Sequence, residues 1–224
     1  QQQRVAIART LAPSPKVLFM DEPLSNLDAK LRLEMRSELK RLHMDTDSTF
    51  VYVTHDQMEA MALATKVCLM NKGVLQQYQP PLDVYNSPAN LFVADFVGNP
   101  TMNFIPSRFE KTGDNEGLLP LFGRKIKFRS STPVQGDRDV VVGIRPEFIS
   151  LEGGDFSGVV YTTLPSGMET TVKLMVGDEV ITSVAFGSVD YNTQSSLSFK
   201  ITGDGILLYD KESGDLISKG SLEN

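Results

Sequence analysis

Apolar residues recur at helical spacing within the first hundred positions. In residues 28–44 four apolar side chains lie four, four and three positions apart, so they share one face of a helix. A shorter helix is expected after Thr54, because Thr54 and Gln57 have the spacing of a capping box. The predicted helices cover residues 3–12, 28–44 and 55–65.

Four short segments that contain apolar residues predict β-strands. The first two, residues 16–20 and 49–53, are continuous apolar segments of the kind that is buried on both faces. The other two, 66–70 and 74–78, flank Asn71-Lys72-Gly73, which is typical of a tight hairpin turn. Strands that alternate with helices predict an α/β fold, here a mainly parallel sheet with both faces covered by helices.

The second half of the chain has a different pattern, with no convincing helix and many short β-rich runs. Glycine marks the change, since 2 of the 17 glycines fall within residues 1–100 and 15 within residues 101–224. Strands are predicted at residues 125–128, 140–144, 158–163, 169–175, 179–185, 196–201 and 206–209. Short strands separated by glycine turns predict an all-β barrel or sandwich. We therefore predict an α/β domain over residues 1–98 and a β-barrel domain over residues 99–224.

Composition and charge narrow the class of protein. The chain has 224 residues, 41% of them hydrophobic, which is enough for one or two globular domains. Its 22 Lys and Arg residues against 28 Asp and Glu give a net charge of −6, the wrong sign for a protein that binds nucleic-acid phosphates. The single cysteine, Cys68, excludes an intrachain disulfide and is expected to be a buried strand residue. No apolar run predicts a membrane span and no export signal is visible, so we expect a soluble protein.

The most informative segment is an apolar run, Val17–Met20, that ends in Asp21 and Glu22. A buried strand that ends in two adjacent carboxylates places them at the carboxyl edge of the sheet, where open α/β folds bind ligands. In P-loop proteins an aspartate at this position holds Mg²⁺, and a neighbouring polar group orients or deprotonates the attacking water. Asp21 would then serve the metal and Glu22 the water. The alternative is a strand that simply ends in solvated acids.

Two further polar motifs follow in order along the chain. Ser25-Asn26-Leu27-Asp28 begins three residues after Glu22, and Thr54-His55-Asp56 follows the second predicted strand. Parallel strands would bring His55 and Glu22 to the same sheet edge. With these motifs the sequence resembles the ATP-binding-cassette (ABC) ATPases. The resemblance implies that Asp21 is the Walker B aspartate, Glu22 the catalytic glutamate, Asp28 the D-loop aspartate and His55 the switch histidine.

The first residues of the chain also resemble this family. Residues 1–9 look like the segment that follows the Leu-Ser-Gly-Gly signature, and the resemblance makes Gln1 the last residue of that signature and a nucleotide contact. The signature glycines and the phosphate loop Gly-x-x-x-x-Gly-Lys-Ser/Thr are missing from the 224 residues. We therefore expect the chain as given, which looks like a piece cut from a longer domain, to be inactive alone.

The second half resembles one branch of the family more closely. The motifs are Pro81-Leu82-Asp83-Val84-Tyr85, Phe92–Gly98, Met102-Asn103-Phe104-Ile105 and Gly143-Ile144-Arg145-Pro146-Glu147. They look like the ATPase subunits of maltose-type carbohydrate importers, whose C-terminal regulatory domain is built from small oligonucleotide-binding-like β-barrels. The Gly-Ile-Arg-Pro-Glu element also occurs in polyamine, iron and glycerol-phosphate importers, so it identifies the domain better than the cargo. Taken without the family, it predicts a barrel turn with an Arg145–Glu147 surface ion pair.

The resemblance implies a function and a set of partners. The whole subunit would bind ATP and Mg²⁺, form a homodimer with a second ATPase subunit, and energise import of a solute; Met102-Asn103-Phe104 favours a carbohydrate. It would be cytoplasmic, peripheral on the inner face of the cell membrane, against permease subunits served by an extracytoplasmic solute-binding protein. His55 would contact the terminal phosphate, and Asp28 would cross the dimer interface. No nucleic-acid partner is expected.

Two other classes of function fit parts of the sequence. The β-rich half and the missing phosphate loop fit a non-hydrolysing regulatory or dimerisation module. Small barrels also often bind oligonucleotides. The negative charge argues against that function, as does the lack of a basic stripe among the aromatic residues of the second half.

Overall fold

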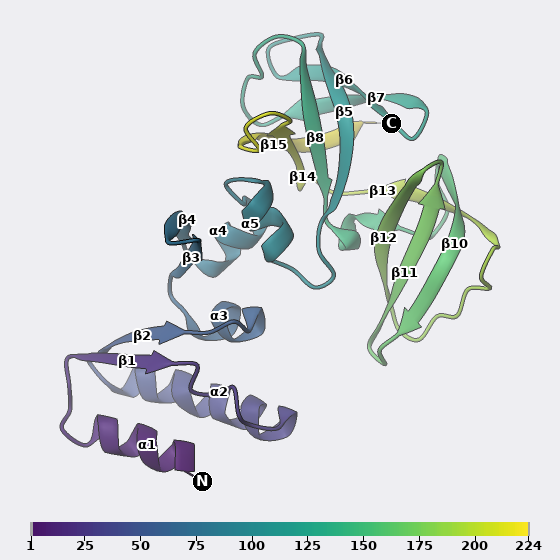
Figure 1. Ribbon diagram of the computed structural model, residues 1–224. Coiled ribbons are helices and arrows are strands. Elements are labelled where there is room, and N and C mark those ends of the chain that lie inside the picture. The colour runs from purple at the N-terminus through teal and green to yellow at the C-terminus, as the bar shows by residue number, and fades with distance from the viewer. Residues whose placement is uncertain (1, 224) are drawn as a thin grey trace. The chain divides into compact units, whose positions relative to one another are not determined.

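The computed structural model describes residues 2–223, which divide into two compact units. One unit comprises residues 2–68 and 78–82, and the other comprises residues 69–77 and 83–223. The boundary expected between residues 98 and 99 stays a prediction. In chain order (Figure 1) the elements are α1 (Gln2–Leu11), β1 (Val17–Asp21), α2 (Ala29–Asp45), β2 (Thr49–Val53), α3 (Gln57–Leu63), β3 (Val67–Asn71), β4 (Val74–Gln79), α4 (Pro81–Asn86), α5 (Leu91–Phe96), β5 (Asn103–Lys111), β6 (Glu116–Leu121), β7 (Arg124–Ser130), β8 (Arg138–Ile144), η1 (Pro146–Phe148), β9 (Ile149–Ser150), β10 (Phe156–Pro165), β11 (Glu169–Val176), β12 (Glu179–Phe186), β13 (Ser196–Ile201), β14 (Ile206–Asp210) and β15 (Leu216–Glu223).

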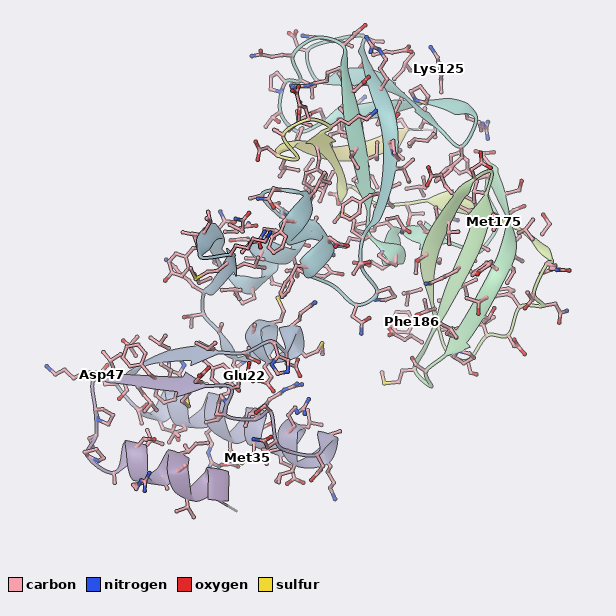
Figure 2. The ribbon with its side chains drawn as sticks, viewed as in Figure 1. Glu22, Met35, Asp47, Lys125, Met175 and Phe186 are labelled. Atoms are coloured by element: carbon pink, nitrogen blue, oxygen red, sulfur yellow. The ribbon has the colours of Figure 1, made fainter. Side chains whose placement is uncertain are left out.

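The first unit contains a two-stranded parallel sheet with helices on one face (Figure 1). β1 and β2 pair in register along their whole length. Alternate residues of β1 are buried, and Leu18 and Met20 pack with Met35 and Leu39 of α2, the helix marked by Met35 in Figure 2. This arrangement confirms the predicted α/β architecture of the first part of the chain.

The opposite face of this sheet is not covered by the described helices of the first unit. Val17, Phe19, Val51 and Val53 are exposed, and Phe19 keeps 75% of its surface in solvent. The expectation that helices cover both faces is therefore wrong for the described residues. The reason is that α1 and α2 both pack on the face that carries Leu18.

Helix α3 begins later than the sequence predicts. Asp56 is its N-cap, and the Asp56 carboxylate accepts hydrogen bonds from the backbone N–H groups of Met58 at 2.8 Å and Glu59 at 3.2 Å. The prediction that Thr54 caps this helix is wrong, because the Thr54 hydroxyl makes other hydrogen bonds. It accepts from the N–H of Asp56 and donates to the carboxylate of Glu59.

The hairpin of β3 and β4 forms as predicted. Lys72 and Gly73 lie at its turn with φ values of +48° and +81°, which a tight hairpin turn requires. Cys68 is exposed, so its prediction as a buried residue is wrong. Side chains alternate between the two faces of a strand, and in β3 it is the neighbour Leu69 that is buried.

Two short helices, α4 and α5, lie between the hairpin and the β-rich region, where the sequence predicts none. α4 begins at Pro81, and α5 is capped by Asn90, whose side chain accepts from the N–H of Val93 at 3.0 Å. Each has six residues, less than two turns, which is too short for a helical period to be visible. Neither these nor the other helices of residues 2–223 are long and apolar enough to cross a membrane.

The second unit contains a closed six-stranded barrel with the strand order β14-β15-β7-β6-β5-β8 (Figure 1). The rings of Phe109 and Phe128 meet edge to face in its core, with centroids 6.4 Å apart. The barrel confirms the predicted all-β fold of this region. Strands β5, β6 and β15 are missing from the prediction because Pro106, Pro120 and Gly220 interrupt their apolar pattern.

A five-stranded antiparallel sheet, ordered β12-β11-β10-β13-β9, completes the second unit. It shares one hydrophobic core with the barrel. Phe122, from the turn between β6 and β7, contacts Phe156 and Phe199 of the sheet at centroid distances of 5.5 and 5.7 Å. The sheet also exposes large apolar side chains, including Met175 and Phe186 (Figure 2).

Candidate functional site

Glu22 occupies a strained turn at the carboxyl end of β1 (Figure 2). Its φ of +42° is a left-handed value that residues other than glycine rarely adopt. Its N–H donates to the carbonyl of Val53 at 2.8 Å, and its carbonyl accepts from the N–H of Ser25 at 3.2 Å and the Ser25 hydroxyl at 2.9 Å. These bonds fix the direction of the chain where β1 ends, beside the end of β2.

His55 meets Glu22 at this edge of the sheet. The Nδ1 atom of His55 lies 3.1 Å from Oε1 of Glu22, and both side chains remain open to solvent, with 72% and 45% of their surfaces exposed. The hydrogen bond to Glu22 and the charge of Glu22 raise the pKa of His55 above its ordinary value. The pair combines a carboxylate that can accept a proton with an imidazole that can donate a hydrogen bond.

Glu59 ties together the two elements that flank His55. It is 2% exposed, and its Oε2 accepts hydrogen bonds from the hydroxyls of Tyr52 at 2.8 Å and Thr54 at 2.9 Å. Burial and the hydrogen bond to Glu59 raise the pKa of Tyr52 above its ordinary value, so Tyr52 keeps its proton and donates. The end of β2 is thereby bonded to the start of α3 on either side of His55.

Two arginines of α2 extend this network. The guanidinium of Arg36 lies 2.8 Å from Oδ2 of Asp56 and 3.8 Å from Oε1 of Glu59, and Arg32 lies 3.4 Å from the same Asp56 oxygen. A pocket of about 10 Å³, close to the lower limit for one water molecule, is lined by Glu22, His55 and residues that include Arg32, Asp56 and Glu59. Asp56 and Glu59 are not among the predicted site residues, although their positions one and four residues after His55 are a visible signal in the sequence.

The other predicted site residues occupy separate positions. Asp21 is the exposed last residue of β1. Asp28 is the N-cap of α2, and its side chain accepts from the N–H of Leu31 at 3.0 Å. Gln1 lies outside the described residues. The structure therefore gives Asp28 a capping role, and the contacts of Gln1, Asp21 and Asp28 with nucleotide or metal stay predictions.

Asp21 offers a single carboxylate to a metal ion. Within residues 2–223 no group of three or more His, Cys, Asp and Glu side chains could hold a metal. Mg²⁺ is commonly bound through one or two carboxylates together with water and substrate phosphates, rather than by a cage of protein ligands. An exposed carboxylate at the end of a strand fits that mode of binding.

Arg145, in the Gly-Ile-Arg-Pro-Glu element, is buried where the sequence predicts a surface residue. It is 2% exposed and forms no ion pair with Glu147, so the expected surface pair is wrong. Its guanidinium instead donates to the carbonyls of Val97 and Tyr85, the latter at 2.8 Å, and lies 4.0 Å from the centre of the Tyr85 ring. Glu147 accepts from the Tyr85 hydroxyl at 2.7 Å. The element therefore joins α4 and the end of α5 to the barrel.

Comparisons with known proteins agree with these motifs. Residues 98–149 match the family model of the MalK OB fold domain. The xylose/arabinose import ATP-binding protein XacK of Haloferax volcanii is 41% identical over 235 residues, which cover 99% of this chain and 60% of XacK. The lactose transport ATP-binding protein LacK of Rhizobium radiobacter is 47% identical over 162 residues, which cover 69% of this chain and 44% of LacK. The uncharacterised ABC transporter ATP-binding protein YurJ of Bacillus subtilis is 37% identical over 230 residues, which cover 97% of this chain and 62% of YurJ.

The chain is homologous to the ATP-binding proteins of ABC transporters. The resemblance inferred from the sequence is thereby confirmed, and residues 98–149 carry the MalK-type OB fold. The chain matches several relatives over nearly all of its residues, and it spans about 60% of the length of those relatives. The roles of individual residues in nucleotide hydrolysis stay predictions.

Proposed function

We propose that the protein to which this chain belongs is an ATP-hydrolysing subunit that energises import of a carbohydrate through a membrane permease. The observation that carries the proposal is the Glu22–His55 pair, whose closest atoms are 3.1 Å apart at the carboxyl edge of β1 and β2. Hydrolysis of a terminal phosphate needs a group that orients or deprotonates water and a donor to the phosphate oxygens. The names of XacK and LacK, which refer to xylose/arabinose import and lactose transport, support a carbohydrate cargo.

Each residue of the site would have a distinct role. Glu22 would accept a proton from the attacking water, and His55 would donate a hydrogen bond to the terminal phosphate of ATP. Asp21 would hold Mg²⁺ through its water shell, and Mg²⁺, when bound, supplies positive charge against the phosphate oxygens. Asp28 and Gln1 would contact nucleotide across the interface of a homodimer.

The proposed partners follow from the same function. The subunit would act at the inner face of the cell membrane, against permease subunits that receive the solute from an extracytoplasmic binding protein. Polyamines, iron and glycerol phosphate are the alternative cargoes. Osmoprotective compounds are a further alternative, because the osmoprotective compounds uptake ATP-binding protein GgtA of Synechocystis is 48% identical over 150 residues.

The test is Glu22→Gln in the complete subunit. The amide keeps the shape of the side chain but cannot accept the proton of water, so ATP turnover should fall by at least about a hundredfold while ATP still binds. His55→Ala should likewise lower turnover more than affinity. A variant that lost ATP binding but kept its turnover per bound ATP would show that these roles are misassigned.

The chain of residues 1–224 provides a second test. It should hydrolyse no ATP above its own Glu22→Gln variant, because phosphoryl transfer depends on positioning and the sequence has no Gly-x-x-x-x-Gly-Lys-Ser/Thr loop to hold the phosphates. Turnover by this chain that Glu22→Gln abolishes would contradict that expectation.

The second candidate function is a non-hydrolysing regulatory or dimerisation module. The observation that favours it is the large β-rich unit, in which the barrel and the five-stranded sheet share one core. Measuring ATP hydrolysis by the complete polypeptide separates the two candidates, since a regulatory module alone would show none. A titration with oligonucleotides at several salt concentrations tests the nucleic-acid alternative, which the net charge of −6 disfavours.

A further inference from the structure

A polar pocket lies in the second unit, at the end of α4, the η1 turn and the barrel strands β14 and β15. Its volume of about 270 Å³ equals that of about nine water molecules in the liquid, at roughly 30 Å³ each. This is near the lower end of the range for ligand pockets, so it fits a small metabolite. The residues that matter for its chemistry are Tyr85, Asn86, Arg145, Asp204 and Lys219.

Arg145 brings a buried positive charge to the wall of this pocket. Its Nε has no hydrogen-bond partner, and no carboxylate of residues 2–223 lies within ion-pair distance of its guanidinium. Its hydrogen bonds go to carbonyl oxygens, it stacks on the Tyr85 ring, and the charge of Glu147 acts on it from beyond ion-pair distance. Buried charges are normally paired, because leaving water costs several kcal/mol. Burial lowers the pKa of Arg145, and the negative charge of Glu147 opposes this effect only in part.

Lys219 is the second cation of the pocket. It is half-buried on β15 and lies opposite Leu207 of β14 in the strand register. Residues 103–144 and 206–223, which form the barrel and are all described, contain nine basic residues, and eight of these form ion pairs within 4.0 Å. Lys219 is the ninth. The one barrel cation without a carboxylate therefore lines the same pocket as the unpaired Arg145.

Asp204 adds an acceptor to the pocket. It is exposed in the turn before β14 and forms no ion pair among the described residues. The neighbouring Gly205 keeps the chain close to Phe148, since a Cβ at Gly205 would lie 2.3 Å from the Phe148 ring. Two cations and one carboxylate leave the site with a net positive charge. The fitting ligand is a small anion that also carries hydroxyl groups.

We propose that this pocket binds a small hydroxylated phosphate ester, with the phosphate near Lys219 and Arg145 and the hydroxyl groups at Asp204. The phosphate supplies the negative charge that the two cations lack, and the hydroxyls donate to the carboxylate. The site would be an effector site on the β-rich unit. It is independent of the proposed ATP hydrolysis, because binding is measured without ATP and none of its residues belongs to the Glu22–His55 site.

The test is calorimetric titration of the 224-residue chain with glucose 6-phosphate, and with inorganic phosphate and glucose separately. We expect glucose 6-phosphate to bind more tightly than either part. Lys219→Met keeps the aliphatic stem but removes the charge, so it should weaken binding by at least about tenfold. Lys200→Met is the matched control, since Lys200 is also half-buried on a strand without an ion pair among the described residues, and it should change the affinity by less than about twofold.

A second variant keeps the test decisive if Lys219→Met does not fold. Asp204→Asn changes an exposed turn residue, and it should weaken binding of glucose 6-phosphate relative to that of inorganic phosphate, which has no sugar hydroxyl to lose. The backbone amide of Gly205 should shift in NMR spectra on addition of the ester. Three results would overturn the proposal: no saturable binding at millimolar concentrations, equal affinity for inorganic phosphate and the ester, or affinity that neither variant alters.

Discussion

Replacing Glu59 with glutamine should loosen the loop that carries His55. The buried Oε2 of Glu59 accepts two hydroxyl hydrogen bonds, from Tyr52 at 2.8 Å and Thr54 at 2.9 Å. Hydrogen bonds to a charged group contribute about 1.5–3 kcal/mol each, against about 0.5–1.5 kcal/mol for neutral partners. Glutamine keeps one acceptor oxygen for both hydroxyls, so the loss is about 1 kcal/mol per bond and about 2 kcal/mol in total. Arg36 would also lose one of its two carboxylate neighbours.

Hydrogen exchange of the backbone amides in β2 and α3 measures this loss directly. A local opening that is easier by about 2 kcal/mol should exchange about thirtyfold faster. Glu38→Gln is the matched control, because Glu38 is a helical glutamate of the same unit whose ion pair with Arg41 is exposed, and it should change exchange by less than about threefold.

Two results would refute the reasoning about Glu59. If Glu59→Gln left exchange in β2 and α3 at the level of the Glu38 control, the buried carboxylate would not hold the loop. If the barrel amides accelerated by the same factor, the effect would be global and not local to His55.

Three further predictions concern other parts of the molecule. Glu22→Gln should lower the pKa of His55 toward its ordinary value in an NMR titration, because the hydrogen bond and charge of Glu22 raise that pKa. The contact between protonated His55 and Glu22 stabilises the fold fully below the ordinary pKa of 6.5. That stabilisation is lost as the pH rises through the raised pKa. A fragment of residues 83–224 should resist urea better than residues 99–224, because Leu91 and Ala94 pack with the buried Leu207 and Tyr209, and exposing two large side chains costs about 3–6 kcal/mol. Gly117→Ala should lower the melting temperature of the barrel, because a Cβ there would lie 2.2 Å from the Phe109 ring and overpacking costs about 1–3 kcal/mol.

Each of these predictions has a clear contrary outcome. An unchanged His55 pKa in Glu22→Gln would mean that the two side chains do not meet in solution. Equal urea midpoints for the two fragments would show that residues 83–98 add nothing to the stability of the β-rich region. An unchanged melting temperature in Gly117→Ala would mean that the Phe109 ring moves aside without cost. Gly113→Ala is the control, because it also lacks a positive φ but its Cβ would lie 3.6 Å from the nearest atom, an ordinary contact.

The sheet edge that carries Glu22 and His55 could be predicted from the sequence for a physical reason. Apolar runs such as 16–20 and 49–53 identify strands, and the parallel pairing of two consecutive strands brings their carboxyl ends together. The polar residues that follow each strand must then lie side by side at this edge. The sequence pattern alone is therefore enough to predict the position of these residues.

The spacing of Asp56 and Glu59 after His55 is visible in the sequence, but the side-chain contacts that these residues make are not. Thr54 does not cap α3 because its hydroxyl is bonded to the Glu59 carboxylate and to the N–H of Asp56, and Asp56 caps the helix in its place. The site of Arg145 likewise depends on carbonyls at Tyr85 and Val97, 60 and 48 residues earlier in the chain. Local patterns carry no information about such long-range partners.

The continuous core of the second unit has a mechanical consequence. The rings of Phe122, Phe156 and Phe199 touch one another at centroid distances of 5.3 to 5.7 Å where the barrel and the sheet meet. Close-packed interiors have low compressibility and transmit strain. A force applied at the exposed Met175 or Phe186 would therefore move the sheet and the barrel together as one rigid body, because the two share one hydrophobic core.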